Sequence, residues 1–168
     1  TNESCRAFEG RRQTRTRTVA WRWTMSHGKT IFIAGASSEA DEVATVIELV
    51  CAAGWTVTLD WTERQRKEIE KYGSFRNIPR EVKSEIVHDL KNAIRAASFF
   101  WWMIPRQKSA GASHEAGFFA GIHDRNAHGF TVVSGDPEPN ADIYAYETSK
   151  TVAFAEHLEA LNFLCRMQ

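Results

Sequence analysis

Residues 98–105 read SFFWWMIP, and every side chain from Phe99 to Ile104 is apolar. A strand with one solvent-exposed face alternates apolar and polar side chains, whereas a strand that is buried on both faces does not. Such a strand is typical of the centre of a parallel sheet with helices on each side. We therefore predict that 98–105 is a central strand and that the rest of the chain supplies its neighbours and covering helices.

Short β-branched runs alternate with stretches of helical apolar spacing from residue 29 onward. The polar connection 61–78 has a length that suggests a lid. The expected strands are 30–35, 55–61, 98–105, 130–135 and a short edge strand at 143–147. The expected helices are one that ends at Gly54, one that begins at Pro79, one that begins near Ser113 and one over 151–165.

This alternation predicts an α/β fold, an open parallel sheet with helices on both faces, because parallel neighbours are joined by right-handed helical crossovers. The predicted strand order is 2-1-3-4-5. Ligands of such sheets bind beyond the carboxyl ends of the first and third strands, where the strand order reverses. We expect the loop GASS (35–38) to face the loop RQKSAGASHE (106–115) across one crevice, with residues 61–63 on its rim.

Glu115 is the single acidic residue of SAGASHEAGFFAGI, 109–122, and it falls at this binding edge. If Ser113 caps the following helix, Glu115 lies in the first turn, where a carboxylate contributes about 0.3–1 kcal/mol against the macrodipole. The same dipole would keep the carboxylate charged at neutral pH and able to attack an electrophilic carbon. Two roles for Glu115 therefore stay open: it stabilises the helix, or it acts as a nucleophile. The small residues that would let a substrate approach are Ala110, Gly111, Ala112, Ala116 and Gly117.

Asp89 falls on the inward face of the helix that begins at Pro79, where an apolar residue is expected. A carboxylate at the edge of a buried stripe needs a partner. One interpretation is that Asp89 belongs to a functional site. In a purely structural interpretation, it forms a salt bridge with Arg95 or with a residue of the N-terminal segment. His88 falls on the polar face. The apolar members of the stripe are Val82, Ile86, Ala93 and Ala97.

Four segments together resemble the nucleoside 2-deoxyribosyltransferase superfamily, which includes the deoxynucleoside monophosphate N-glycosidases. The resemblance covers about residues 29–134, and its most specific part is the small-residue loop followed by Glu-x-Gly. It implies a flavodoxin-like three-layer sandwich. The segments are IFIAGASS, AAGWTVTLDW, EIVHDLKNAIRAASFFWWMI and SAGASHEAGFFAGI.

The resemblance also implies roles for single residues. Glu115 would be the nucleophile that forms a covalent glycosyl ester, and Asp89 would orient the sugar or the nucleophile. Ser109 and Ser113 lie where the glycosidase branch uses hydroxyl groups and backbone amides around the sugar or phosphate. Neighbouring subunits often complete such sites in this family, so the resemblance implies a homo-oligomer.

The chain departs from the family pattern at three places. The acid that usually begins the central strand is Ser98 here, the Thr or Ser before the glutamate is His114, and the first loop lacks a Gly-Arg-rich pattern. Base and phosphate preference therefore stay open. FIAGASSEADEV and LDWTE are also similar to Toll/interleukin-1-receptor-like domains, which cleave the nicotinamide glycosidic bond of NAD. A nucleotide-binding sensor or interaction domain without turnover is a further alternative.

Breaking an N-glycosidic bond produces an oxocarbenium-like centre, which a nearby carboxylate can stabilise and capture. The leaving base needs a proton or hydrogen bond, for which Asp60, His114 and Asp89 are candidates. Trp61 could stack on the base, or pack at the sheet edge; Tyr72 and Phe75 are weaker candidates. The remaining predicted substrate-binding residues are Gly35, Ala36 and Ser37 of the GASS loop, which offers backbone N–H groups, and Gly111.

The composition limits the classes of binding partner that we expect. The 21 basic and 21 acidic residues balance, so net charge gives no reason to expect a nucleic-acid partner. The chain contains no run of 18 apolar residues, the length that a membrane-spanning helix needs. We expect a small-molecule nucleoside or nucleotide as partner and no cofactor. The six histidines form no HExxH motif and have no cysteine partner, so no metal site is expected.

Residues 1–24 carry six arginines and two glutamates and show no hydrophobic period. We interpret this stretch as a disordered or appended basic leader before a single domain over 25–168, with a functional basic arm as the alternative. The three cysteines are widely spaced without a CxxC motif. This usage favours a cytoplasmic protein.

Overall fold

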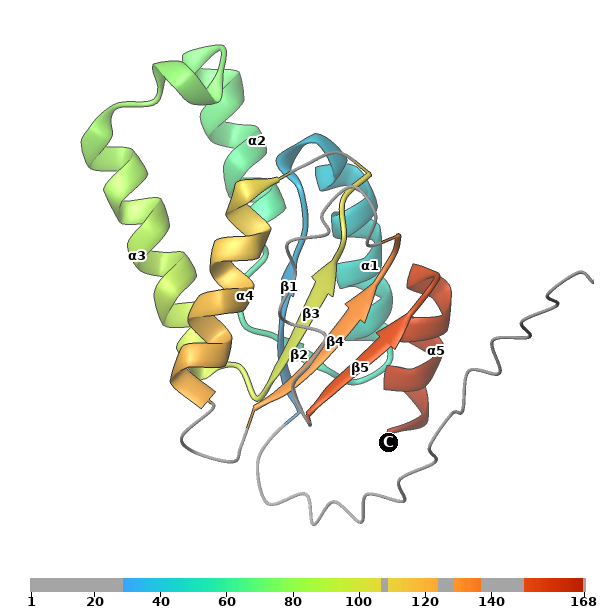
Figure 1. The fold of residues 1–168 in the computed structure, drawn as a ribbon. Coiled ribbons are helices and arrows are strands. Elements are labelled where there is room, and N and C mark those ends of the chain that lie inside the picture. Colours follow the sequence, from blue (N-terminus) through green and yellow to red (C-terminus); the bar gives the residue numbers. More distant parts are fainter. Residues whose placement is uncertain (1–28, 107–108, 124–128, 137–149, 168) are drawn as a thin grey trace, which may run out of the picture.

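The structure, a computed structural model, describes residues 29–106, 109–123, 129–136 and 150–167. Its five strands form one parallel sheet in the order β2-β1-β3-β4-β5, as predicted (Figure 1). The fold is therefore an α/β, flavodoxin-like arrangement. The strands are β1 (Thr30–Ala34), β2 (Thr56–Val57), β3 (Phe99–Met103), β4 (Phe130–Ser134) and β5 (Thr151–Phe154).

Helices cover both faces of the sheet. Figure 1 shows α1 and α5 on one side and α3 and α4 on the other, with α2 beyond the upper end of β1. The helices are α1 (Ala40–Ala52), α2 (Trp61–Tyr72), α3 (Arg80–Ala96), α4 (Ala110–His123) and α5 (His157–Arg166). Two short 3₁₀ turns, η1 (Ser37–Glu39) and η2 (Phe75–Asn77), precede α1 and α3.

β3 occupies the centre of the sheet and is buried along its whole length. Phe99, Trp101 and Met103 pack into the core on the side of α1 and α5. Phe100 and Trp102 pack into the core on the side of α3 and α4. The prediction of a central strand covered on both faces is confirmed.

A buried polar chain joins β3, β4 and α5. The indole Nε1 of Trp101 donates a hydrogen bond to Ser134 Oγ at 2.7 Å, and Ser134 Oγ lies 2.7 Å from His157 Nδ1. Because an indole N–H can only donate, Ser134 Oγ accepts from it, and the tautomer of the imidazole decides which of Ser134 and His157 donates to the other. Ser134 is 0% exposed, so water cannot replace either contact.

The predicted strand 55–61 is wrong in its second half. β2 has two residues, and Trp61 is the first residue of α2, because Asp60 caps that helix by accepting from the backbone N–H groups of Thr62 and Glu63. The indole of Trp61 donates to the carbonyl of Ile33 at 2.8 Å, which ties the start of α2 to β1. The connection 61–78 is therefore largely a helix.

The prediction at the C-terminal end is also corrected. Residues 151–154 form the edge strand β5 beside β4, whereas a helix was expected from 151. The β-branched pair Thr151 and Val152 favours a strand, and the helix begins only at His157. The predicted strand 143–147 and the leader 1–24 lie outside the described residues.

The two loops expected to form the crevice do face each other. The carboxylate of Glu39 accepts the backbone N–H of Arg106 at 3.0 Å, and the Arg106 guanidinium lies 3.0 Å from Glu42. At the end of β1, a Cβ on Gly35 would lie 2.6 Å from Val43 Cγ2. A glycine is therefore needed for α1 to pack this closely to the sheet.

None of the helices among the described residues is long and apolar enough to cross a membrane.

Ser134→Ala tests the buried polar chain. The change leaves the indole N–H of Trp101 without an acceptor where water cannot reach, so we expect a loss of about 1–3 kcal/mol in the free energy of unfolding. Urea unfolding measures the loss as a lower midpoint with an unchanged slope. Ser84→Ala, on the exposed face of α3, is the control and should change stability by less than about 0.5 kcal/mol. Equal midpoints for both variants would contradict the expectation.

Candidate functional site

A cavity of about 720 Å³ lies beyond the carboxyl end of β1, between α2, α3 and α4. Its size is within the range of pockets that hold small organic ligands. The residues that line it are Gly35, Ser37, Leu59, Trp61, Arg64, Gln65, Phe75, Ile78, Lys83, Ile86, Val87, Asp89, Leu90, Lys91, Ile94, Ser109, Gly111, Ala112, His114, Glu115 and Phe118.

The wall opposite Glu115 is made mainly by α3. Ile86, Leu90 and Ile94 recur at intervals of four residues, so they lie on one face of that helix. Phe118 of α4 extends the apolar surface on the other side. An apolar cavity with few polar groups is the usual form of a site for a flat or partly apolar ligand.

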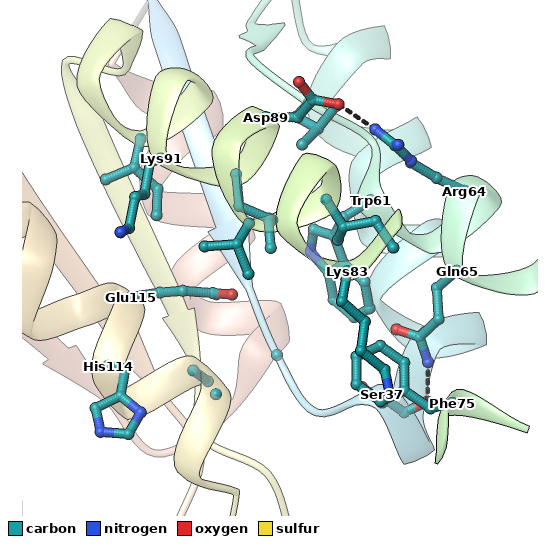
Figure 2. Close-up of a pocket in the computed structure, with 18 of the residues that line it drawn as sticks. Ser37, Trp61, Arg64, Gln65, Phe75, Lys83, Asp89, Lys91, His114 and Glu115 are labelled. Atoms are coloured by element: carbon teal, nitrogen blue, oxygen red, sulfur yellow. Dashed lines mark hydrogen bonds and ion pairs between the residues drawn. The ribbon is translucent and has the colours of Figure 1, made fainter. Parts of the chain in front are cut away.

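Glu115 projects from α4 into this cavity (Figure 2). Within the described part of the chain, its carboxyl group makes no hydrogen bond and no ion pair. Burial raises the pKa of the Glu115 carboxyl from 4.5 to about 7, because desolvation disfavours the charged form. The group is therefore divided between its acid and its carboxylate near neutral pH.

Two predictions about this helix are wrong. α4 begins at Ala110, so Ser113 does not cap it but donates its hydroxyl proton to the carbonyl of Ser109 at 3.1 Å within the helix. Glu115 consequently lies in the second turn, where the dipole of the helix end has little effect. Desolvation decides its protonation instead, and the expectation of a fully charged carboxylate at neutral pH is corrected.

Asp89 also lines the cavity, but its carboxylate is engaged elsewhere. It forms an ion pair with Arg64 of α2, whose guanidinium lies 3.8 Å from Glu85 as well. Figure 2 shows the Asp89 carboxylate directed toward Arg64 and not toward Glu115. The partner expected in a structural role was Arg95 or a residue of the N-terminal segment, and Arg64 takes that place because 61–72 is a helix beside α3.

Most of the other predicted site residues gather around the same cavity. Those that line it are Gly35, Ser37, Trp61, Ser109, Gly111 and His114. Four predicted residues, Ala36, Asp60, Ser113 and the weaker stacking candidate Tyr72, do not line it. Ala36 is buried, Asp60 caps α2, and Ser113 is exposed on the outer side of α4.

Sequence reasoning missed the contribution of α2 and the polar face of α3. Arg64, Gln65 and Lys83 line the cavity and were not proposed. The signal for α2 was present as an aspartate followed three residues later by a glutamate, Asp60 and Glu63, which is a helix-start pattern. Its strongly polar sequence hid the helical period.

No group of three or more His, Cys, Asp or Glu residues is arranged to hold a metal ion in the residues that the structure covers. Comparisons of the chain with protein-family models, with curated proteins and with solved structures found no match.

Glu115→Gln tests the desolvated carboxyl. Folded Glu115 keeps its proton up to about pH 7, whereas the unfolded side chain loses it near 4.5, so the folded state binds more protons between these values. The stability that Glu115 contributes is full below pH 4.5 and is lost as the pH rises through 7. The free energy of unfolding of the variant, relative to that of the parent protein, should therefore increase by up to about 3 kcal/mol as the pH rises from 5 to 8.

Urea unfolding at several pH values measures this difference. Glu48→Gln on the exposed surface of α1 is the matched control, and it should show no comparable change between pH 5 and pH 8. A pH-independent difference between Glu115→Gln and the parent protein would mean that Glu115 is not desolvated.

Proposed function

We propose that the protein cleaves or transfers the N-glycosidic bond of a nucleoside or nucleotide, with Glu115 as the nucleophile. The observation that carries the proposal is a desolvated carboxyl group, unpaired among the described residues, that projects into a ligand-sized cavity at the carboxyl edge of the sheet. A structural carboxylate would be paired or solvated, because burial without a partner costs free energy. Such a cost is common at catalytic groups.

The first chemical step forms an ester. One carboxylate oxygen of Glu115 bonds to the anomeric carbon while the carbon–nitrogen bond breaks, and the bonding electron pair leaves with the base, which takes up a proton. In the second step, water or another base attacks the same carbon and gives up its own proton. The ester carbon–oxygen bond breaks, and its electron pair returns to Glu115.

The proton for the leaving base comes from His114 in this proposal. Of the three candidates, Asp60 is occupied as the cap of α2, and Asp89 is ion-paired with Arg64. His114 lines the cavity next to Glu115 in the chain and has no partner among the described residues. An imidazole is suited to general acid catalysis near neutral pH.

The cavity walls suit a planar base. Ile86, Leu90 and Ile94 provide a flat apolar surface, and the rings of Trp61 and Phe75 also face the cavity. Removing the aromatic surface of the base from water favours binding by about 25 cal/mol per Å² of apolar area. Low polarity around the anomeric carbon also strengthens its attraction to the carboxylate.

Release of free base tests the proposed function. The protein is incubated with deoxynucleosides, with their 5′-monophosphates and with NAD, and free base is measured by chromatography. Glu115→Gln should lower the rate at least about a thousandfold, because it removes the nucleophile but keeps the shape of the side chain. Glu48→Gln should keep the parent rate. No base release from any substrate by the parent protein would refute the proposal for these substrates.

The pH dependence of kcat/KM distinguishes a nucleophile from an acid. A nucleophilic Glu115 must be deprotonated in the free enzyme and the proton donor His114 must be protonated, so kcat/KM should rise as the pH increases from 5.5 toward the Glu115 pKa of about 7 and fall again at higher pH. If Glu115 acted as the general acid, kcat/KM would not rise over the first part of this range. Rates from pH 5.5 to pH 8.5 at low substrate concentration decide between the two.

A further inference from the structure

We infer that Phe118 is a positioning residue for Glu115. Its ring covers the turn of α4 from which Glu115 projects and keeps water away from the carboxyl group. Arg95 and Lys91 of α3 hold the ring in that place. The inference deepens the proposed function and rests on it, because it assigns the side chains that prepare the nucleophile for attack.

Phe118 and Glu115 lie on one face of α4. They are three residues apart in the helix, and both line the cavity. A long side chain in a helix leans toward the N-terminal end, so the ring of Phe118 lies over the turn that carries Glu115. Phe118 also packs against the apolar core on the α3 and α4 side of the sheet. The ring therefore forms the part of the cavity wall next to the carboxyl group.

Two cations of α3 contact this ring. The guanidinium carbon of Arg95 lies 5.2 Å from the ring centroid of Phe118, and the ammonium of Lys91 lies 6.0 Å from it. Both are cation–π distances. Arg95 is itself held by Asn92, whose side-chain oxygen accepts from the guanidinium at 3.2 Å. Neither cation lies within ion-pair distance of a carboxylate in the part of the chain that the structure describes, so no acidic side chain there draws it away from the ring.

Exclusion of water, not a neighbouring charge, controls the protonation of Glu115. Burial raises the pKa of its carboxyl to about 7, and desolvation is the cause. Figure 2 shows the Asp89 carboxylate directed toward Arg64. It also shows the carboxyl group of Glu115 and the ammonium of Lys91 pointing in opposite directions, so this cation does not face the carboxyl group. The titratable and charged groups that line the cavity with Glu115 are Arg64 of α2, Lys83, Asp89 and Lys91 of α3, and His114 of α4.

A dry carboxyl group suits the proposed reaction. A carboxylate without a hydration shell does not have to lose water before it bonds to the anomeric carbon. It also attracts the positive charge that develops on that carbon more strongly in surroundings of low polarity. If the ring of Phe118 moved away, water would solvate the carboxylate and the pKa of Glu115 would fall toward 4.5. Glu115 would then be a weaker nucleophile.

The proton affinity of Glu115 tests the inference without a substrate. In protein with ¹³C-labelled glutamate, the carboxyl resonance that is missing from Glu115→Gln belongs to Glu115, and its titration gives the pKa. We expect Phe118→Ala to lower this pKa so that the proton binds at least about tenfold more weakly. Arg95→Met should weaken proton binding about threefold, and Arg95→Lys should keep the parent value because the cation remains. Because Arg95 is exposed, Arg95→Met should fold even if Phe118→Ala does not.

Matched controls separate this effect from a general loss of structure. Phe75 also lines the cavity and contacts a cation, since the ammonium of Lys83 lies 5.5 Å from its ring centroid. Figure 2 shows Phe75 across the cavity from Glu115, so Phe75→Ala should leave the pKa of Glu115 unchanged. Arg166→Met, in the last turn of α5 on the other side of the sheet, controls for the loss of a positive charge.

A kinetic measurement distinguishes positioning from packing. In Phe118→Ala, the rising limb of kcat/KM should move to lower pH together with the pKa of Glu115. The maximum of kcat/KM should fall at least about tenfold, because the carboxylate is now solvated. A ring that only stabilises the fold would change the amount of folded protein and leave the position of this limb unchanged.

The outcomes separate this inference from the proposed function. An unchanged pKa of Glu115 in both Phe118→Ala and Arg95→Met would overturn the inference, and so would an equal fall in Phe75→Ala. A lowered pKa in both variants, with no base release by the parent protein, would support the positioning role and refute the proposed function. Base release by the parent protein, with an unchanged pKa in both variants, would do the reverse.

Discussion

The rest of the fold depends on the burial of β3 on both of its faces. Trp101 and Trp102 point to opposite sides of the sheet, and each is almost fully removed from water. Such a strand is stable only between two layers of helices, which in turn requires parallel neighbours and helical crossovers. The crossovers place the loops after β1 and β3 at one edge, and the carboxyl group of Glu115 arises from the helix that follows β3. Two bulky side chains in sequence thus determine where a ligand can bind.

Much of the fold was predictable because apolar spacing in the central strands is dictated by burial on both sides. The strand order and the boundaries near β1, β3 and β4 followed from that pattern. The errors fall at the edges of the sheet, where packing is weaker than local capping or pairing. At Trp61 the cap formed by Asp60 converted an expected strand into a helix, and at Thr151 pairing with β4 converted an expected helix into a strand. At Trp61 a local cap outweighs the alternating pattern, and at Thr151 the tertiary pairing with β4 outweighs the helical period.

The position of Glu115 was predictable, whereas its protonation was not. Its place after the central strand follows from topology, but the pKa depends on how completely the surrounding side chains exclude water, and these come from α3 and α4 together. The partner of Asp89 was missed for the same reason, since Arg64 comes close only because the preceding segment is helical. Sequence patterns locate a residue on an element, whereas its charge state is a property of the assembled neighbours.

α2 differs from the other walls of the cavity in what attaches it. Thr62 is the one buried residue of this helix, and its surface contacts with the neighbouring helices include the ion pairs of Arg64 with Asp89 and of Arg66 with Asp41. Ionic contacts on a surface weaken as dissolved salt screens them, whereas the apolar contacts of α3 and α4 do not. This wall is therefore the part of the site with the smallest free energy of local opening. A molecule that fills the cavity would also hold α2 against the rest of the chain. Ligand binding should therefore slow the exchange of the amide hydrogens of α2 with solvent.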